Sequence, residues 1–269
     1  MAKKRGSAKG VRRILNVVPS KNTEQDWKYD VAVQSAAVTA VAAPPPSKDL
    51  RAAWWNIGDQ ESTGSCVGWA STDGVMRYHL VNAGKLGQKQ LLSPRCTWMS
   101  SKETDQYVAR PETFIEGAGT SLKAAMDVCR KFGVVLESVL PFHIATTMYI
   151  GDEDQFYAGA AQRKCSSYFN LGKNFTQWRS WLASHGPLMV GLNVDQTWDN
   201  ATATKGILDV YKPNTARGGH AVCLAGYTKD GRFIVRNSWG TGWGDKGFAY
   251  ASEAYITAGF FNESYGVTV

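Results

Sequence analysis

The feature of this sequence that most limits its fold is a glycine- and tryptophan-rich segment near the C-terminus, residues 237–247 (NSWGTGWGDKG). It continues one strand-like run, RFIVR, and leads into a second, GFAYAS. Its second half, residues 242–247, has the G-x-G-x-x-G spacing of a dinucleotide-binding loop. Such a loop needs a strand before it and a helix after it. Because a strand-like run follows here, we exclude a nucleotide site at this segment.

Helix patterns come before strand patterns along the chain. Helices are predicted over three ranges: 66–84, 121–132 and 175–184. In the last of these, Trp178, Trp181 and Leu182 fall on one face. Four strand-like runs follow, containing LMVGLNV, HAVCLAGYT, RFIVRNSWG and GFAYAS. Helices followed by an antiparallel sheet are typical of the α+β class.

The formal charge of +7 comes from the N-terminal end of the chain. Residues 1–23 contain seven bases and no acid, whereas the other 246 residues contain 23 bases and 23 acids. A nucleic-acid-binding fold spreads its basic charge over a folded face. The distribution therefore argues against a nucleic-acid partner.

Three consecutive prolines, residues 44–46, predict an extended linker. We therefore divide the chain into a basic, flexible N-terminal segment with a proline linker, residues 1–46, and one compact domain, residues 47–269. No run of 18 apolar residues is present, so we expect no membrane span. The basic N-terminus lacks the apolar core of a secretory signal, which predicts a cytoplasmic protein or one exported by a leaderless route.

The five cysteines are widely spaced, and none forms a C-x-x-C pair. This argues against a zinc site, and we expect neither a metal nor a cofactor. Cys66 differs from the others because it follows Gly64-Ser65 and opens the first predicted helix. The helix dipole lowers the pKa of a thiol there, and the free N–H groups of the helix end can bind an oxyanion. Gln60 lies six residues upstream, where its side chain is a second possible donor.

Residues 237–247 match all eight fixed positions of the pattern N-S-W-G-x-G-W-G-x-x-G, and Cys66 lies 154 residues before His220 and 171 before Asn237. In these respects the chain resembles the papain-like cysteine peptidases of the C1 family. Thr63 stands near the nucleophile where the family usually has a cysteine, so the common disulfide cannot form. The chain thus looks like a disulfide-poor, bacterial-type variant.

The resemblance implies a two-lobed α+β fold. A helical N-terminal lobe would carry the cysteine helix, an antiparallel β-rich C-terminal lobe would carry His220 and Asn237, and the active site would lie in the cleft between them. By the same resemblance, Cys66 is the nucleophile, His220 its acid/base partner and Asn237 the residue that orients the imidazole. Gln60 would form the oxyanion hole with the Cys66 N–H.

The expected substrate-binding residues also come from the resemblance. Gly117, Ala118 and Gly119 precede the second predicted helix, like the glycine strand that pairs with substrate backbone in the family. Gly219, beside His220, is included with them. Trp239 is expected to contact substrate and to shield the imidazole–amide hydrogen bond from water.

The function expected from these residues is a cysteine endopeptidase that acts through a Cys66 thioester on polypeptide substrates. The alternatives are an effector-type acyl transferase, a deamidase or a peptidoglycan amidase with the same triad, and a catalytically weak peptide-binding module. We expect a monomer, with an inhibitor protein as a further partner. Residues 24–43 either pad the surface, add a strand, or cross the cleft and restrain activity.

Overall fold

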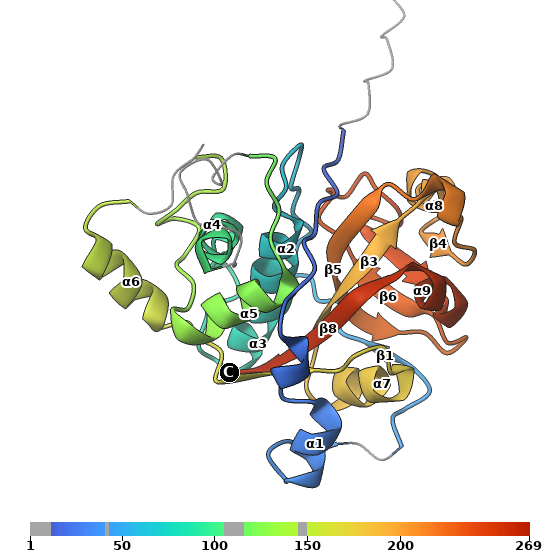
Figure 1. Ribbon diagram of the computed structural model, residues 1–269, viewed down its shortest axis with the longest axis horizontal. Helices are drawn as coiled ribbons and strands as arrows, with labels where there is room; N and C mark the ends of the chain where they lie inside the picture. Colours follow the sequence, from blue (N-terminus) through green and yellow to red (C-terminus); the bar gives the residue numbers. More distant parts are fainter. Residues whose placement is uncertain (1–11, 41–42, 105–115, 145–149) are drawn as a thin grey trace, which may run out of the picture.

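The computed structural model describes residues 12–40, 43–104, 116–144 and 150–269. Figure 1 shows two halves, one made of helices α2 to α6 and the other built around the sheet that contains β3, β5 and β6. The elements in chain order are η1 (Thr23–Gln25), α1 (Tyr29–Gln34), β1 (Lys48–Asp49), α2 (Cys66–Gly68), η2 (Trp69–Met76), α3 (Arg77–Asn82), α4 (Pro94–Thr104), α5 (Leu122–Lys131), α6 (Glu153–Ala161), β2 (Ser167–Asn170), α7 (Phe175–Ser184), β3 (Leu188–Val194), α8 (Gln196–Asp199), β4 (Ile207–Leu208), η4 (Pro213–Thr215), β5 (Gly218–Tyr227), β6 (Phe233–Arg236), β7 (Phe248–Ala251), α9 (Glu253–Gly259) and β8 (Phe260–Thr268). The α+β, two-lobed fold expected from the sequence is confirmed.

The predicted helix at Cys66 forms as three consecutive segments, α2, η2 and α3, of which η2 is a π-helix. This helix lies directly against the sheet. A Cβ atom on Gly74 would lie 2.9 Å from the Cβ of Cys223 on β5, so only glycine fits at this crossing. The contact brings the start of the helix, Cys66, toward β5.

The sheet runs in the order β2-β8-β3-β5-β6-β7-β4, and β1 pairs with β5. Its neighbours are antiparallel except for β4 and β7, which are parallel. The register of β5 on β6 pairs Cys223 with Arg236. Because His220 lies near the start of β5 and Asn237 follows β6, this register brings these two side chains together at one end of the sheet.

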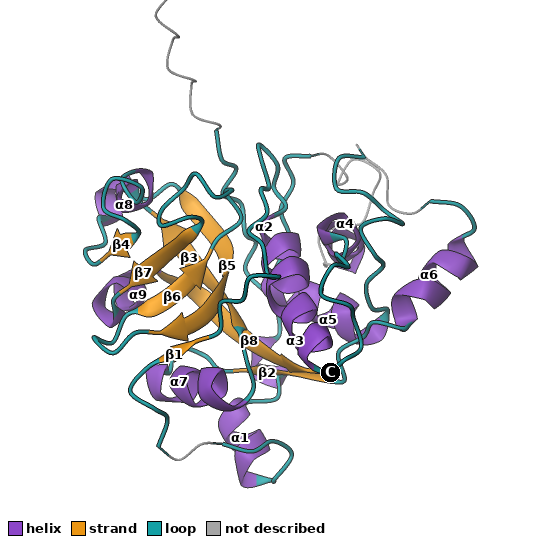
Figure 2. Ribbon diagram, turned by 180° about the vertical axis from the view of Figure 1, so that it is seen from behind, coloured by secondary structure: helices purple, strands orange, loops and turns teal. Residues whose placement is uncertain are grey.

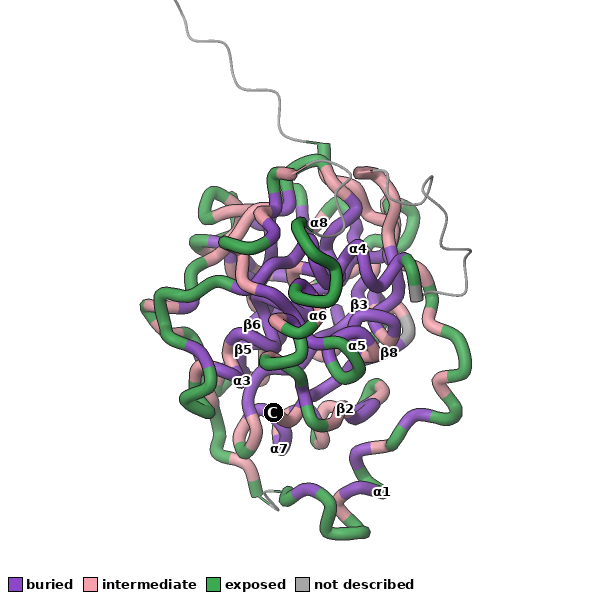
Figure 3. The backbone as a smooth tube through the Cα atoms, turned by 90° about the vertical axis from the view of Figure 1, so that its left-hand side faces the viewer, coloured by how far each residue is buried: buried purple, intermediate pink, exposed green. Residues whose placement is uncertain are grey.

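Other helices also pack on the sheet, with α7 beneath it and α9 at its outer side in Figure 2. Helix α7 packs on β3 and β5 through Trp178, Trp181 and Leu182, the face predicted from the sequence, and all three are fully buried. Figure 3 shows that the buried chain is concentrated in β3, β5, β6 and the helices around them. Among the described residues, no helix is long and apolar enough to cross a bilayer.

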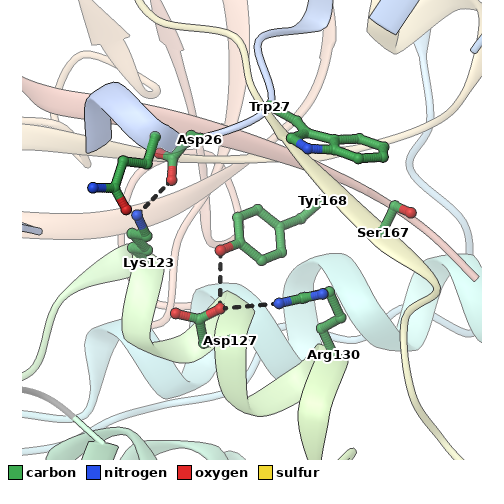
Figure 4. Close-up of a pocket in the computed structure, with 8 residues that line it drawn as sticks. Asp26, Trp27, Lys123, Asp127, Arg130, Ser167 and Tyr168 are labelled. Carbon is green, nitrogen blue, oxygen red and sulfur yellow. Dashed lines mark hydrogen bonds and ion pairs between the residues drawn. The ribbon is translucent and has the colours of Figure 1, made fainter. Parts of the chain in front are cut away.

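Residues 24–40 lie at the end of the molecule that carries β2 and α7 (Figure 1). The buried carboxylate of Asp26 accepts hydrogen bonds from Asn170 (2.9 Å) and Tyr265 (2.8 Å) and pairs with Lys123 at 2.7 Å. The Lys123 pair borders a cavity of about 340 Å³ that Trp27 and Tyr168 also line (Figure 4). This part of the N-terminal segment therefore pads the surface.

Residues 12–18 of the N-terminal segment cross the cleft between the two lobes, which was one of the possibilities for residues 24–43. They run between residues 117–120 and the start of β5, along the blue trace in Figure 1. Ile14 to Val18 are apolar except for Asn16, and Val17 is buried in the main core cluster. Burial of these side chains is the physical reason that this stretch follows the domain surface. Residues 1–11 of the expected flexible segment lie outside the described residues.

Candidate active site

Cys66 is fully buried at the start of the helix that faces β5. Its thiol is within hydrogen-bonding reach of the backbone at Ala221, the residue after His220, and at Val67. The sheet and the helix therefore converge on this sulfur. Backbone N–H groups around a thiol favour its ionised form, which is the nucleophilic one.

His220 and Asn237 form a buried pair. The Nε2 of His220 lies 2.7 Å from Oδ1 of Asn237, and the backbone N–H of Ser238 donates to the same oxygen at 2.8 Å. Because Oδ1 can only accept, Nε2 carries a proton, and in a neutral ring Nδ1 then holds the lone pair. Nδ1 is buried and has no hydrogen-bond partner within the described ranges, which leaves it available to take a proton from a thiol.

Trp239 covers this pair. Its ring centroid lies 5.0 Å from that of His220, and the two planes are tilted by 34°. Trp198 packs edge-on against His220 from another direction, at 5.6 Å. A hydrogen bond enclosed by two indole rings is kept from water, and the low local dielectric strengthens it.

Gln60 is fully buried and fixed at both ends of its amide. Its Oε1 accepts from the hydroxyl of Ser238 at 2.8 Å, and its Nε2 donates to the carbonyl of Thr63 at 3.0 Å. The amide nitrogen has two hydrogens, so one remains for another acceptor. The anchoring places this donor on the loop that leads to Cys66.

The cysteine and the histidine are both neutral in this arrangement. Burial raises the pKa of the Cys66 thiol to about 11, against the smaller opposing effect of its backbone hydrogen bonds. Burial also lowers the pKa of His220 to about 4, although the hydrogen bond that its ring donates to Asn237 acts in the other direction. At neutral pH the site thus holds a thiol and an imidazole rather than a thiolate and an imidazolium.

Residues 12–18 occupy the channel between Gly117–Thr120 on the helical side and Gly218–His220 on the sheet side, which we call the interlobe groove. The N–H of Val17 donates to the carbonyl of Gly219 at 3.2 Å, and that of Val18 donates to Thr120 at 3.1 Å. The side chain of Asn16 donates to the carbonyl of Gly117. The chain thus binds a stretch of its own extended backbone from both sides.

The expected substrate-binding residues do not all face the groove. A Cβ atom on Gly119 would lie 2.0 Å from the carbonyl oxygen of Asn16, and Gly117 and Gly219 accept the hydrogen bonds just described. The carbonyl of Ala118, in contrast, accepts from the indole of Trp98 at 2.8 Å. Its polar backbone group is therefore used within the helical lobe.

Sequence reasoning missed Arg13, which anchors residues 12–18 at the Trp239 end of the groove. Its guanidinium donates to both carboxylate oxygens of Asp59 and to the carbonyls of Glu61 and Trp239. The side chain is only 14% exposed. The basic composition of the tail contains no signal that separates Arg13 from its neighbours, because the partner groups come from distant loops.

No cluster of three or more His, Cys, Asp or Glu side chains suited to a metal ion occurs in the described part of the chain. Cys66, His220, Asn237 and Gln60 supply a thiol, an imidazole and two amides. These groups are those of covalent acyl transfer by a cysteine nucleophile.

Comparison with known proteins identifies the family. The profile of the "Papain family cysteine protease" family matches residues 44–265. The chain is 25% identical over 217 residues to Cysteine proteinase 1 of Dictyostelium discoideum, covering 77% of this chain and 60% of that protein. It is also 24% identical over 241 residues to a cysteine protease of Blomia tropicalis, covering 86% of this chain and 68% of that one.

Two solved structures share the fold. Xylellain, a cysteine protease from Xylella fastidiosa, superposes with a TM-score of 0.78 at 21% identity, with 100% of both chains covered. Digestive procathepsin L 3 of Tenebrio molitor larval midgut gives a TM-score of 0.63 at 17% identity, covering 95% of this chain and 77% of that one. With the family profile matched over most of its length, the chain belongs to the papain family of cysteine proteases.

Proposed function

We propose that this protein is a cysteine endopeptidase held latent by residues 12–18. The observation that carries the proposal is the buried 2.7 Å bond between His220 and Asn237, which leaves Nδ1 of the imidazole available beside the helix that begins at Cys66. A nucleophile, a base and a group that orients the base are the parts that covalent peptide hydrolysis requires.

The proposed reaction uses these groups in turn. Nδ1 of His220 takes the Cys66 proton, and the thiolate attacks the peptide carbonyl carbon. The Cys66 N–H and the remaining Nε2 hydrogen of Gln60 stabilise the oxyanion of the tetrahedral intermediate. The imidazolium then protonates the leaving amine as the C–N bond breaks. Water, deprotonated by His220, hydrolyses the Cys66 thioester and releases the carboxylic acid product.

The groove favours polypeptide over the other acyl substrates that we considered. Residues 16–18 lie in it as extended chain, bound through backbone groups of Gly219 and Thr120. Backbone pairing recognises a peptide whatever its side chains are. An isolated glutamine side chain or a peptidoglycan amide does not present such a run of backbone groups.

Latency follows from the same contacts. Substrate cannot reach Cys66 while residues 12–18 occupy the groove, and burial keeps both catalytic groups neutral. We therefore expect low activity while residues 12–18 occupy the groove and higher activity once they leave it.

Labelling with a thiol-directed epoxide peptide tests the assignment. We expect Arg13→Ala protein to be labelled and to cleave a quenched fluorescent peptide, and a further Cys66→Ala or His220→Ala substitution to abolish both. Cys96→Ala removes another buried cysteine as the matched control and should leave labelling unchanged. Absence of Cys66-dependent labelling and cleavage would refute the peptidase proposal. Ammonia release without peptide cleavage would point to deamidation instead.

A further inference from the structure

Arg13 occupies a site that is built to hold a guanidinium. Its Nη2 lies 3.2 Å from Oδ2 of Asp59, and its Nη1 also donates to Oδ1 of that carboxylate. The carbonyls of Glu61 and Trp239 each accept from it at 3.1 Å. The guanidinium carbon also lies 5.8 Å from the centroid of the Trp239 ring. A planar fork of donors is matched here by a carboxylate, two carbonyls and an aromatic face.

The domain itself, rather than Arg13, holds Asp59 in place. The N–H of Glu61 donates to Oδ1 of Asp59 at 2.8 Å, and Asp59 pairs with Trp239 in an antiparallel bridge. Gly240 donates its N–H to Gly58 at 3.0 Å, and a Cβ atom on Gly240 would lie 2.9 Å from Oδ2 of Asp59. The acceptors therefore remain arranged when Arg13 leaves.

The position of this site relative to the catalytic groups gives it a role with substrate. Asp59 directly precedes Gln60, and Trp239 covers His220. The glycine-rich stretch 117–119, which binds Asn16, lies at the other end of the occupied groove. We therefore expect a substrate polypeptide to pair with residues 117–119 and to continue past Cys66. The part of it beyond the scissile bond then passes Asp59.

We propose that Asp59, Trp239 and the Glu61 carbonyl form a substrate subsite that selects arginine. In the active protein, an arginine on the far side of the scissile bond from residues 117–119 replaces Arg13. The inference rests on the proposed peptidase function and adds a substrate class to it. Lysine, a point charge without the planar fork, binds less well than arginine, and uncharged side chains bind least.

Quenched fluorescent peptides test this subsite in Arg13→Ala protein, where no arginine of the chain fills it. Each peptide carries either arginine or citrulline, its uncharged analogue, at one position on one side of the cleaved bond. At one position beyond the cleaved bond, we expect kcat/KM to be about tenfold higher with arginine than with citrulline. One charge-assisted hydrogen-bonded pair supplies enough binding energy for a ratio of this size. Adding Asp59→Asn should reduce this preference to less than about twofold.

The matched control is Asp154→Asn, which removes the same charge from an exposed position on α6 and should keep the preference. Equal kcat/KM values for the arginine and citrulline peptides would overturn the subsite while leaving the peptidase function intact. An arginine preference that survives Asp59→Asn would do the same. If no peptide is cleaved and no epoxide labels Cys66, the peptidase function fails. Fluorescence anisotropy of the same peptides on Arg13→Ala/Cys66→Ala protein then decides the subsite, and equal affinities for arginine and citrulline refute it.

Discussion

Removing the Arg13 side chain is expected to open the interlobe groove and speed up alkylation of Cys66. Arg13 anchors residues 12–18 to Asp59 and to two backbone carbonyls. Truncation to alanine deletes these contacts and leaves the hydrogen bonds of Val17 and Val18 in place. The substitution therefore shifts the balance between the occupied and the open groove without touching Cys66, His220 or Asn237.

The magnitude follows from the exposure of the partners. The Asp59 side chain is 41% exposed, so solvent screening limits the ion pair to about 1 kcal/mol or less. The two bonds to carbonyls add about 0.5–1.5 kcal/mol each, and part of this is recovered by water in the open state. A total of about 2 kcal/mol corresponds to a roughly 30-fold larger population of the open groove.

Iodoacetamide labelling at pH 7.5, followed by mass spectrometry of the Cys66 peptide, measures this population. When the groove is mostly occupied, the labelling rate is proportional to the open fraction, so it should rise about 30-fold in Arg13→Ala. Arg12→Ala removes the same charge from an exposed neighbour and should change the rate less than about twofold. Equal rates for wild type and Arg13→Ala with iodoacetamide and with the epoxide peptide alike would refute the anchoring role of Arg13.

Three further predictions concern the interlobe groove, the His220–Asn237 pair and the two buried histidines. Gly119→Ala places a Cβ atom 2.0 Å from the Asn16 carbonyl, so we expect faster Cys66 labelling than in wild type, and an unchanged rate contradicts the close contact. In an Arg13→Ala background, Asn237→Ala should lower kcat roughly 10- to 100-fold with little change in KM, because the imidazole loses its orienting bond, and unaltered kcat argues against that role. The melting temperature should fall between pH 6.5 and about 4, because His79 and His220 have pKa values of about 4 when folded and near 6.5 when unfolded. The unfolded chain binds more protons in that window, so stability is lost as the pH falls, and His79→Gln should reduce the slope measured by calorimetry.

The sequence was sufficient to predict the class of fold because its helix and strand periodicities are local. The buried face of α7, with Trp178 and Trp181, follows from helical spacing alone. The proximity of His220 and Asn237 has a different origin, since it depends on the register of β5 on β6. Spacing along a chain does not determine register, and only the family resemblance indicated this pair.

The occupation of the groove by residues 12–18 could not be predicted from the sequence. This stretch has no regular secondary structure and therefore no periodicity to detect. Its conformation depends on the absence of a Cβ atom at Gly119 and Gly218, which lie about a hundred and two hundred residues away along the chain. The π-helical segment η2 escaped prediction as well, because it interrupts an otherwise ordinary helical pattern.

We expect residues 12–18 to restrain the Cys66–His220 pair electrostatically as well as sterically, because burial and, to a smaller extent, the charge of Arg13 lower the pKa of His220. A rise in the thiol pKa from 9.0 to about 11 lowers the thiolate fraction at neutral pH about 100-fold, so Cys66 is a poor nucleophile even toward a reagent small enough to reach it. We expect water to reach the thiol and the imidazole when the segment leaves, so that proton transfer from Cys66 to His220 becomes favourable. Iodoacetamide and the bulky epoxide peptide should therefore both react faster in Arg13→Ala protein. If the segment acted by steric exclusion alone, only the bulky reagent would respond, and iodoacetamide would label the wild type and the variant equally fast.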